Sequence, residues 1–162
     1  VLDLCCGAGR HSVVLAQRGL AVTGLDIEPG LLAAARESAR DKGVRLELRR
    51  GDARRLGFRS RFDAVLSLFT SFGYFAAEAE DLAVLRGARR ALKPSGALLL
   101  DLLNKEWLMR HFDSSFRGRG DGPVRGTLNR LTFDLERGRL DTRRTLLLKS
   151  GRRRETFLSI RT

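Results

Sequence analysis

A short glycine-containing segment near the start of the chain holds the first residues suited to binding chemistry. In VLDLCCGAGR, Asp3 stands at the end of an apolar run, and Gly7 and Gly9 follow it. A glycine loop between a strand and a helix is typical of nucleotide and phosphate sites, because glycine lets the backbone approach a ligand closely. The loop indicates a nucleotide-like ligand, and a purely structural turn is the alternative.

The loop lacks the third glycine of the dinucleotide fingerprint, since Ser12 stands three residues beyond Gly9. A pyrophosphate needs the close packing onto the helix N-terminus that this glycine allows, whereas a zwitterionic methionine tail does not. Asp3 adds a negative charge where the ammonium group of a sulfonium nucleoside would lie. These features favour a nucleoside with a positively charged tail over a dinucleotide.

Two further acidic residues follow the next two apolar runs. Asp26 can accept hydrogen bonds from both hydroxyls of a ribose, and Asp52 can accept one from an adenine amino group. A turn or helix-capping role remains open for Asp26, and a turn role for Asp52. Because the carboxyl ends of parallel strands share one edge of a sheet, these residues and Asp3 are expected to converge on one crevice.

The first hundred residues alternate between short apolar runs and helix-period segments, which is the pattern of a parallel α/β sheet. Strands are expected at 1–4, 21–25, 44–48, 62–68 and 97–103, and helices at 11–18, 31–41 and 76–92. The run at 97–103 is nearly all apolar, so burial on both faces is expected there. Residues 93–96 (Lys-Pro-Ser-Gly) are expected to close the preceding helix.

The sequence changes character after Asn104, and period-two alternation with turn signals predicts an antiparallel meander. The expected elements are a short helix at 105–112 with Trp107 as a core anchor, a charged glycine-rich loop at 117–126, and strands from Thr127 onward with turns at 137–138 and 150–151. We therefore predict a Rossmann-like, doubly wound, mainly parallel sheet over 1–104 with an appended antiparallel β meander. A helix plus antiparallel β insertion over 105–162 is expected to cover the acceptor site.

The ordered set of segments resembles the successive motifs of class I S-adenosylmethionine (SAM)-dependent methyltransferases. The segments are VLDLCCGAGRHSVVLAQRG, VTGLDIEPGLLAAAR, LRRGDARRL, FDAVLSLFTSFGYF and ALKPSGALLLDLLN. The resemblance covers residues 1–104 and implies an enzyme that uses SAM as its methyl donor. Within it, LFTSFGYF resembles a branch whose acceptors are small molecules.

The resemblance also implies contacts with the cofactor for nine residues along the sheet edge. By this resemblance, Asp3 braces the loop near the methionine end, and Gly7 and Gly9 line the methionine and ribose. Asp26 holds the ribose and Ile27 flanks the adenine. Asp52 and Ala53 reach the adenine edge, and Leu68 and Phe69 pass beneath the cofactor.

Catalytic residues are not identified by the sequence, but three positions are candidates on the acceptor side. Tyr74 and Asn104 lie at or after the carboxyl ends of the fourth and fifth predicted strands. His11 stands at the junction of loop and helix, where a general base could act, and a capping or packing role is its alternative. No metal site is predicted, because His11 and His111 lack ligand partners at a recognisable spacing.

The net charge of +12 is concentrated in the last part of the chain, since 13 basic and five acidic residues between Arg117 and Thr162 give that segment +8. A basic segment can steer an anionic ligand or nucleic acid, or it can be a solvated surface. It leaves an RNA or protein methyltransferase as an alternative, although no Asn/Asp-Pro-Pro-aromatic motif follows the fourth strand. A non-catalytic SAM-binding protein is a further alternative.

A short-chain NAD-dependent oxidoreductase shares the sheet but needs a Tyr-x-x-x-Lys pair. Glu78 stands four residues after Tyr74, so this class is disfavoured.

The chain opens at Val1 inside an apolar run, so we expect the family's N-terminal helices before it and its closing helix and hairpin after Thr162. Such a fragment is expected to bind SAM poorly. Neither a secretion signal nor an apolar run of transmembrane length is visible. Cys5 and Cys6 are adjacent, which suits packing rather than a disulfide or a metal, and a reducing cytoplasm is the expected location. The oligomeric state is not predicted.

Overall fold

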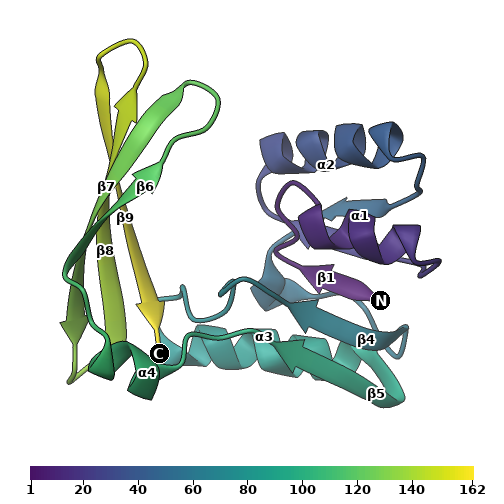
Figure 1. Ribbon diagram of the computed structural model, residues 1–162. Coiled ribbons are helices and arrows are strands. Elements are labelled where there is room, and N and C mark those ends of the chain that lie inside the picture. The colour runs from purple at the N-terminus through teal and green to yellow at the C-terminus, as the bar shows by residue number, and fades with distance from the viewer. The chain divides into compact units, whose positions relative to one another are not determined.

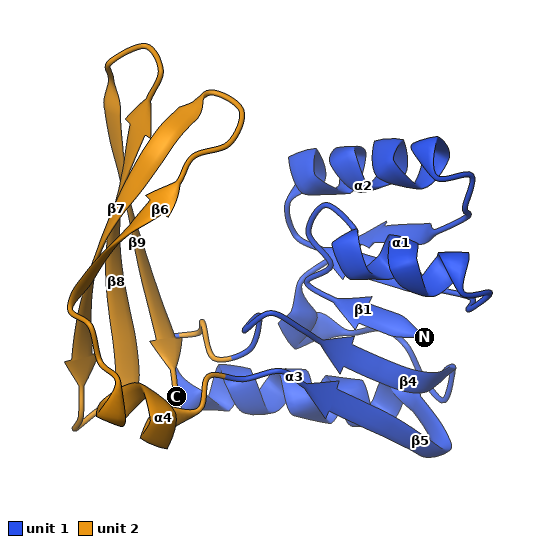
Figure 2. Ribbon diagram, in the orientation of Figure 1, with its two compact units in different colours: residues 1–72, 76–102 blue, residues 73–75, 103–162 orange.

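The computed structural model describes all residues 1–162, and they form two units, each built on its own sheet (Figures 1 and 2). Unit 1 comprises Val1–Phe72 and Ala76–Leu102, and unit 2 comprises Gly73–Phe75 and Leu103–Thr162. The chain therefore passes between the units three times.

Unit 1 contains a sheet of five parallel strands in the order β3-β2-β1-β4-β5. The strands are β1 (Leu2–Leu4), β2 (Thr23–Asp26), β3 (Glu47–Arg50), β4 (Phe62–Ser67) and β5 (Leu92–Leu100). The direction of winding reverses between β1 and β4, and ligands of such sheets bind at the carboxyl edge beside this switch point. The predicted Rossmann-like sheet is confirmed.

Three helices connect these strands: α1 (Arg10–Gln17), α2 (Pro29–Asp41) and α3 (Glu78–Ala91). With right-handed crossovers, α1 and α2 cover one face of the sheet and α3 covers the other (Figure 1). Pro29 occupies the first turn of α2, where its missing N–H is not needed. The apolar stripe of α2, which includes Leu32 and Ala35, is buried.

The core of unit 1 is centred on β1 and β4, two of the three strands with a neighbour on each side. Leu2, Leu4 and Val65 are at most 2% exposed. Burial of this kind contributes about 25 cal/mol per Å² of apolar surface. The loops at the carboxyl ends of both strands therefore start from well-packed positions.

Two predictions about the fifth strand are wrong. β5 begins at Leu92 rather than Ala97, and residues 93–96 are taken up by a register irregularity against β4. The strand is not buried on both faces, since Leu98 and Leu99 are 37% and 55% exposed. The reason is that β5 lies at the sheet edge with β4 as its single paired neighbour.

Unit 2 contains an antiparallel sheet in the order β6-β7-β8-β9, preceded by the short helix α4 (Lys105–Arg110). Its strands are β6 (Ser115–Arg119), β7 (Val124–Asp134), β8 (Arg139–Leu148) and β9 (Arg153–Arg161). The predicted meander is confirmed. The loop predicted at 117–126 is wrong, because β6 and the start of β7 pair through this segment and leave only a short turn between them.

Residues 73–75 belong to unit 2 although they lie far from it in sequence. The Arg161 N–H donates to the Gly73 carbonyl at 2.8 Å, and Arg139 Nη1 donates to the Phe75 carbonyl at 2.9 Å. Arg139 also reaches Ser159 through its Nε at 2.7 Å. This short excursion of the chain is thus fixed to the ends of β8 and β9.

Trp107 is not the core anchor that the sequence suggested. It is 60% exposed and stacks on His111, with 4.7 Å between the ring centroids. Helix α4 buries none of its residues, so Trp107 has no apolar core to enter at this position. None of the helices has the length and apolar character needed to cross a membrane.

Candidate functional site

The loop after β1 is the first part of the candidate site, and its backbone is left-handed at Cys5, Gly7 and Gly9, with φ of 57°, 55° and 78°. A Cβ atom on Gly9 would lie 3.0 Å from the Ala35 Cβ, so this glycine allows α1 to approach α2. A Cβ on Gly7 would meet no atom within 4 Å. Space beside the loop backbone is therefore open at Gly7.

Asp26 fastens this loop to the end of β2. Its Oδ2 accepts from the Gly7 N–H at 2.8 Å, and its Oδ1 accepts from the Glu28 N–H at 2.9 Å. Because a carboxylate oxygen has two lone pairs, each can accept one more hydrogen bond. The backbone donors hold the carboxylate in a fixed orientation at the carboxyl edge, which suits it to a pair of adjacent hydroxyls.

Asp3 is buried, with 2% of its surface exposed. Its Oδ2 accepts a 2.6 Å hydrogen bond from Ser12 Oγ on α1. Burial raises the pKa of Asp3 above its ordinary value, and the hydrogen bond from Ser12 acts in the opposite direction. This geometry supports the bracing role that the resemblance implied, since Asp3 ties β1 to the start of α1.

The two cysteines of the loop are free thiols. Desolvation, followed by the nearby carboxylates Asp26 and Asp3, raises the pKa of Cys5 to about 11. Desolvation and the same carboxylates raise the pKa of Cys6 to about 12. Both sulfurs stay protonated at neutral pH, so they are poor nucleophiles.

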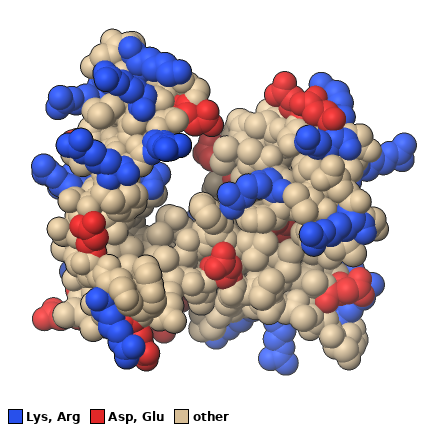
Figure 3. Space-filling view, in the orientation of Figure 1, with Lys and Arg blue, Asp and Glu red and all other residues tan.

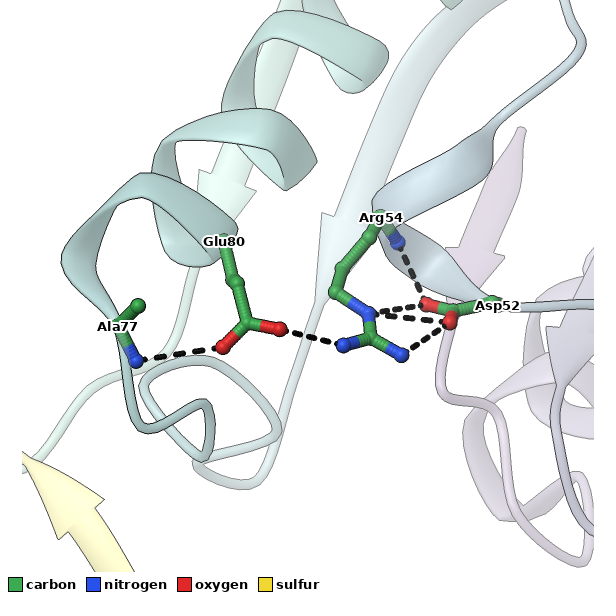
Figure 4. A network of polar contacts seen from close by, with 4 residues as sticks. All are labelled: Asp52, Arg54, Ala77 and Glu80. Carbon is green, nitrogen blue, oxygen red and sulfur yellow. Dashed lines mark hydrogen bonds and ion pairs between the residues drawn. The ribbon is translucent and has the colours of Figure 1, made fainter.

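Asp52 belongs to a network of ion pairs with Arg54 and Glu80 (Figure 4). The Asp52 carboxylate accepts from Nε and Nη2 of Arg54 and from the Arg54 backbone N–H at 2.5–3.0 Å. Arg54 Nη1 contacts Glu80 Oε1 at 2.5 Å, and the other Glu80 oxygen accepts from the Ala77 N–H at the start of α3. The hydrogen bonds from Arg54 lower the pKa of Asp52.

This network changes what Asp52 can do. A carboxylate offers about four lone-pair positions, and Arg54 donates four hydrogen bonds to Asp52. A ligand amino group therefore has to compete with the Arg54 guanidinium for Asp52. Sequence reasoning missed Arg54, although its position two residues after Asp52 was a usable signal.

The turn after β4 contains two consecutive left-handed residues, Phe69 and Thr70, each with φ of 58°. Asp101, just after β5, holds the turn: its Oδ2 accepts from the Phe69 N–H at 2.9 Å and its carbonyl from the Thr70 N–H at 3.2 Å. Such strained backbone is typical of ligand sites. Asp101 was missed because it lay inside a segment expected to be a buried strand.

Phe69 also links the two loops beside the switch point. It is 70% exposed, and the Arg10 guanidinium lies 4.4 Å from its ring centroid. Ile27 is 55% exposed at the end of β2, Ala53 is buried in η1 (Ala53–Arg55), and Leu68 is half-buried. The structure thus places all nine expected cofactor residues in unit 1, at or just beyond the carboxyl ends of β1 to β4.

The three acceptor-side candidates do not share a unit. His11 is half-buried in unit 1, with its Nε2 3.4 Å from Arg10 Nη2. Tyr74 and Asn104 belong to unit 2. Asn104 caps α4, because its Oδ1 accepts from the Trp107 N–H at 2.9 Å.

A groove of about 730 Å³ lies at the opposite edge of the parallel sheet. Its lining includes Val1, Val22 and Phe62, at the amino ends of β1, β2 and β4. The acids and the glycine loop are at the carboxyl edge, so the chemistry indicates that edge as the site. No group of His, Cys, Asp and Glu side chains is arranged to hold a metal ion.

Comparison with known proteins agrees with this geometry. A family model described as a methyltransferase domain matches residues 1–96. A glycine/sarcosine N-methyltransferase of Halorhodospira halochloris is 35% identical over 118 residues, which are 71% of this chain and 44% of the relative. The chain thus spans less than half the length of this curated relative.

Two solved structures resemble the fold. A SAM-bound amino pentose methyltransferase from Micromonospora echinaspora has a TM-score of 0.72 at 27% identity, covering 99% of this chain and 68% of that one. A SAM-dependent methyltransferase from Clostridium acetobutylicum has a TM-score of 0.82 at 19% identity, with 99% and 65% covered, and it supports the fold alone. On the family match and the shared sequence, the chain belongs to the methyltransferase domain family.

Proposed function

We propose that the protein transfers a methyl group from SAM to a small-molecule acceptor. The observation that carries the proposal is the fixed Asp26 carboxylate beside the open space at Gly7. Methyl transfer is a direct displacement at a carbon that the sulfonium already activates, so the protein's work is alignment and exclusion of water. Relatives named as a glycine/sarcosine N-methyltransferase and a ubiquinone biosynthesis O-methyltransferase support a small-molecule acceptor.

Within this proposal each end of the cofactor meets different side chains. Asp26 accepts from the ribose hydroxyls through its remaining lone pairs, and Asp52 accepts from the adenine amino group in competition with Arg54. The exposed side chains of Ile27 and Phe69 supply apolar surface against the adenosyl group. Five further residues are proposed to contact the cofactor because of their positions at the ends of the strands and in the loops that follow: Asp3, Gly7, Gly9, Ala53 and Leu68.

Tyr74, Asn104 and His11 are retained as proposed acceptor-side residues, without an assigned catalytic base. A cytoplasmic location is part of the proposal, because Cys5 and Cys6 are both free thiols.

The test is calorimetric titration of SAM into the full-length protein and its Asp26→Ala variant. Loss of the ribose acceptor is expected to weaken SAM binding at least tenfold, about 1.4 kcal/mol. Asp41→Ala is the matched control, since it removes an exposed carboxylate at the end of α2, and its affinity should be unchanged.

Asp26 also holds the loop, so thermal unfolding of each variant is measured in parallel. Asp26→Asn retains one oxygen acceptor and is expected to bind SAM more weakly than the parent but better than Asp26→Ala. Equal SAM affinity in the parent and a folded Asp26→Ala protein would refute the ribose assignment.

A further inference from the structure

A groove of about 470 Å³ lies on the antiparallel sheet, entirely within unit 2. Four arginines line it, one from each strand: Arg117, Arg130, Arg143 and Arg153. Glu155 is the single acidic residue in its lining. The groove therefore combines a small-molecule volume with a strong excess of positive charge.

None of these four arginines has a partner within the chain. All four are exposed, and none makes an ion pair or a side-chain hydrogen bond. Two other arginines of the same sheet are satisfied: Arg144 Nε donates to Asn129 at 2.8 Å, and Arg139 donates to Ser159. Four guanidinium groups without a partner thus line this one groove.

The strand register brings two of these charges face to face. Arg130 on β7 pairs directly with Arg143 on β8. Side chains at such paired positions have Cβ atoms about 4.5–5.5 Å apart, and like charges there destabilise the sheet. A bound anion between the two guanidinium groups would turn this repulsion into attraction.

The neighbouring strands extend the positive surface along the groove. Arg117 on β6 pairs with Leu128, which is two residues from Arg130 on the same face of β7. Arg153 on β9 pairs with Leu147, four residues beyond Arg143 on β8, a step of about 13 Å along the strand. Basic side chains are gathered over this sheet in the space-filling view (Figure 3).

We propose that this groove binds a small molecule that carries more than one phosphate group. The guanidinium fork matches the geometry of phosphate oxygens and binds them through paired hydrogen bonds. The groove is lined by four guanidinium cations and one carboxylate, so a ligand that balances this positive charge carries more than one phosphate. A continuous nucleic-acid strand is less favoured, since Glu155 would oppose its backbone and the volume is that of a small ligand.

The test is calorimetric titration with inorganic pyrophosphate, at low salt and again at about 0.15 M salt, where charges more than about 8 Å apart are largely screened. Replacement of the facing pair, Arg130→Gln with Arg143→Gln, is expected to weaken pyrophosphate binding at least tenfold. A second double variant, Arg117→Gln with Arg153→Gln, should also weaken it, and it leaves the facing pair intact.

The matched control is Arg36→Gln with Arg89→Gln, which removes the same charge from exposed positions on α2 and α3. Its pyrophosphate affinity should stay close to that of the parent, because the change in net charge alone does not remove the groove. Equal weakening in the control and in both groove variants would overturn the proposal.

Thermal unfolding supplies a second readout that does not depend on any enzymatic activity. The Arg130→Gln, Arg143→Gln variant should unfold at a higher temperature than the parent without ligand, since the like-charge pair is gone. Pyrophosphate should raise the unfolding temperature of the parent and leave that of this variant unchanged. Binding of a short single-stranded RNA without binding of pyrophosphate would contradict the proposal, as would no binding of either.

Discussion

Gly7 and Gly9 stand two residues apart in the same loop, yet alanine at the two positions is expected to have different effects. Both have left-handed backbone, with φ of 55° and 78°. Their surroundings differ: the Cβ position of Gly7 is open, whereas that of Gly9 lies against Ala35 of α2. Substitution at Gly7 should therefore act mainly on binding, and substitution at Gly9 mainly on stability.

The magnitudes follow from two separate costs. A side chain in the left-handed region costs about 1–2 kcal/mol, and both variants incur this cost. Gly9→Ala also places a Cβ 3.0 Å from the Ala35 Cβ and 3.4 Å from its Cα, which forces α1 and α2 apart. Overpacking of this kind costs about 1–3 kcal/mol, so Gly9→Ala should lose about 2–5 kcal/mol in total.

Urea unfolding and calorimetric titration with SAM separate the two effects. Gly7→Ala should lower the free energy of unfolding by about 1–2 kcal/mol and weaken SAM binding at least tenfold. Gly9→Ala should lower the free energy of unfolding by more. At a temperature where it is fully folded, its loss of SAM affinity should be smaller than that of Gly7→Ala.

Equal destabilisation of the two variants would show that the contact of Gly9 with Ala35 carries no cost. SAM binding by Gly7→Ala at the affinity of the parent would show that the cofactor does not occupy the open space at Gly7.

Two further predictions concern buried and paired carboxylates. Burial raises the pKa of Asp3, so the folded state holds the proton more tightly than the unfolded state does. The contribution of Asp3 to stability therefore falls as the pH rises through the interval between the unfolded and folded pKa values. The stability advantage of the parent over Asp3→Asn should therefore shrink as pH rises from about 4 to 7 in urea unfolding, and a growing gap would contradict the assignment. In Arg54→Gln, the pKa of Asp52 should rise toward its ordinary value, as followed by NMR, because the guanidinium that lowers it is gone. The same variant should bind SAM more tightly, since a competing donor has left Asp52; weaker SAM binding would argue against that competition.

The parallel sheet could be predicted because its signals are local. Each apolar run and each following helix is readable from residue type alone, and Pro29 is a local signal for the start of α2. The edge of the sheet could not be read in this way. Leu98 and Leu99 are exposed because β5 has a neighbour on one side only, and strand neighbours are a property of the whole fold.

The same distinction separates the site residues that were found from those that were missed. Asp26 was found because it ends the second apolar run, after the run that leads into the glycine loop. Arg10, Arg54 and Asp101 were missed because their roles depend on partners elsewhere: Arg10 lies over Phe69, Arg54 bridges two carboxylates, and Asp101 holds the turn after β4. The roles expected for the cofactor residues remain predictions until the variants are measured.

The excursion of residues 73–75 into unit 2 has a consequence for how the chain withstands cleavage. A protease cut after Leu102 would break the last of the three crossings between the units. The amino-terminal product would still contain Gly73 and Phe75, whose carbonyls accept hydrogen bonds from Arg161 and Arg139 in the carboxyl-terminal product. A nicked chain would thus run as two fragments in a denaturing gel while remaining one particle in native buffer.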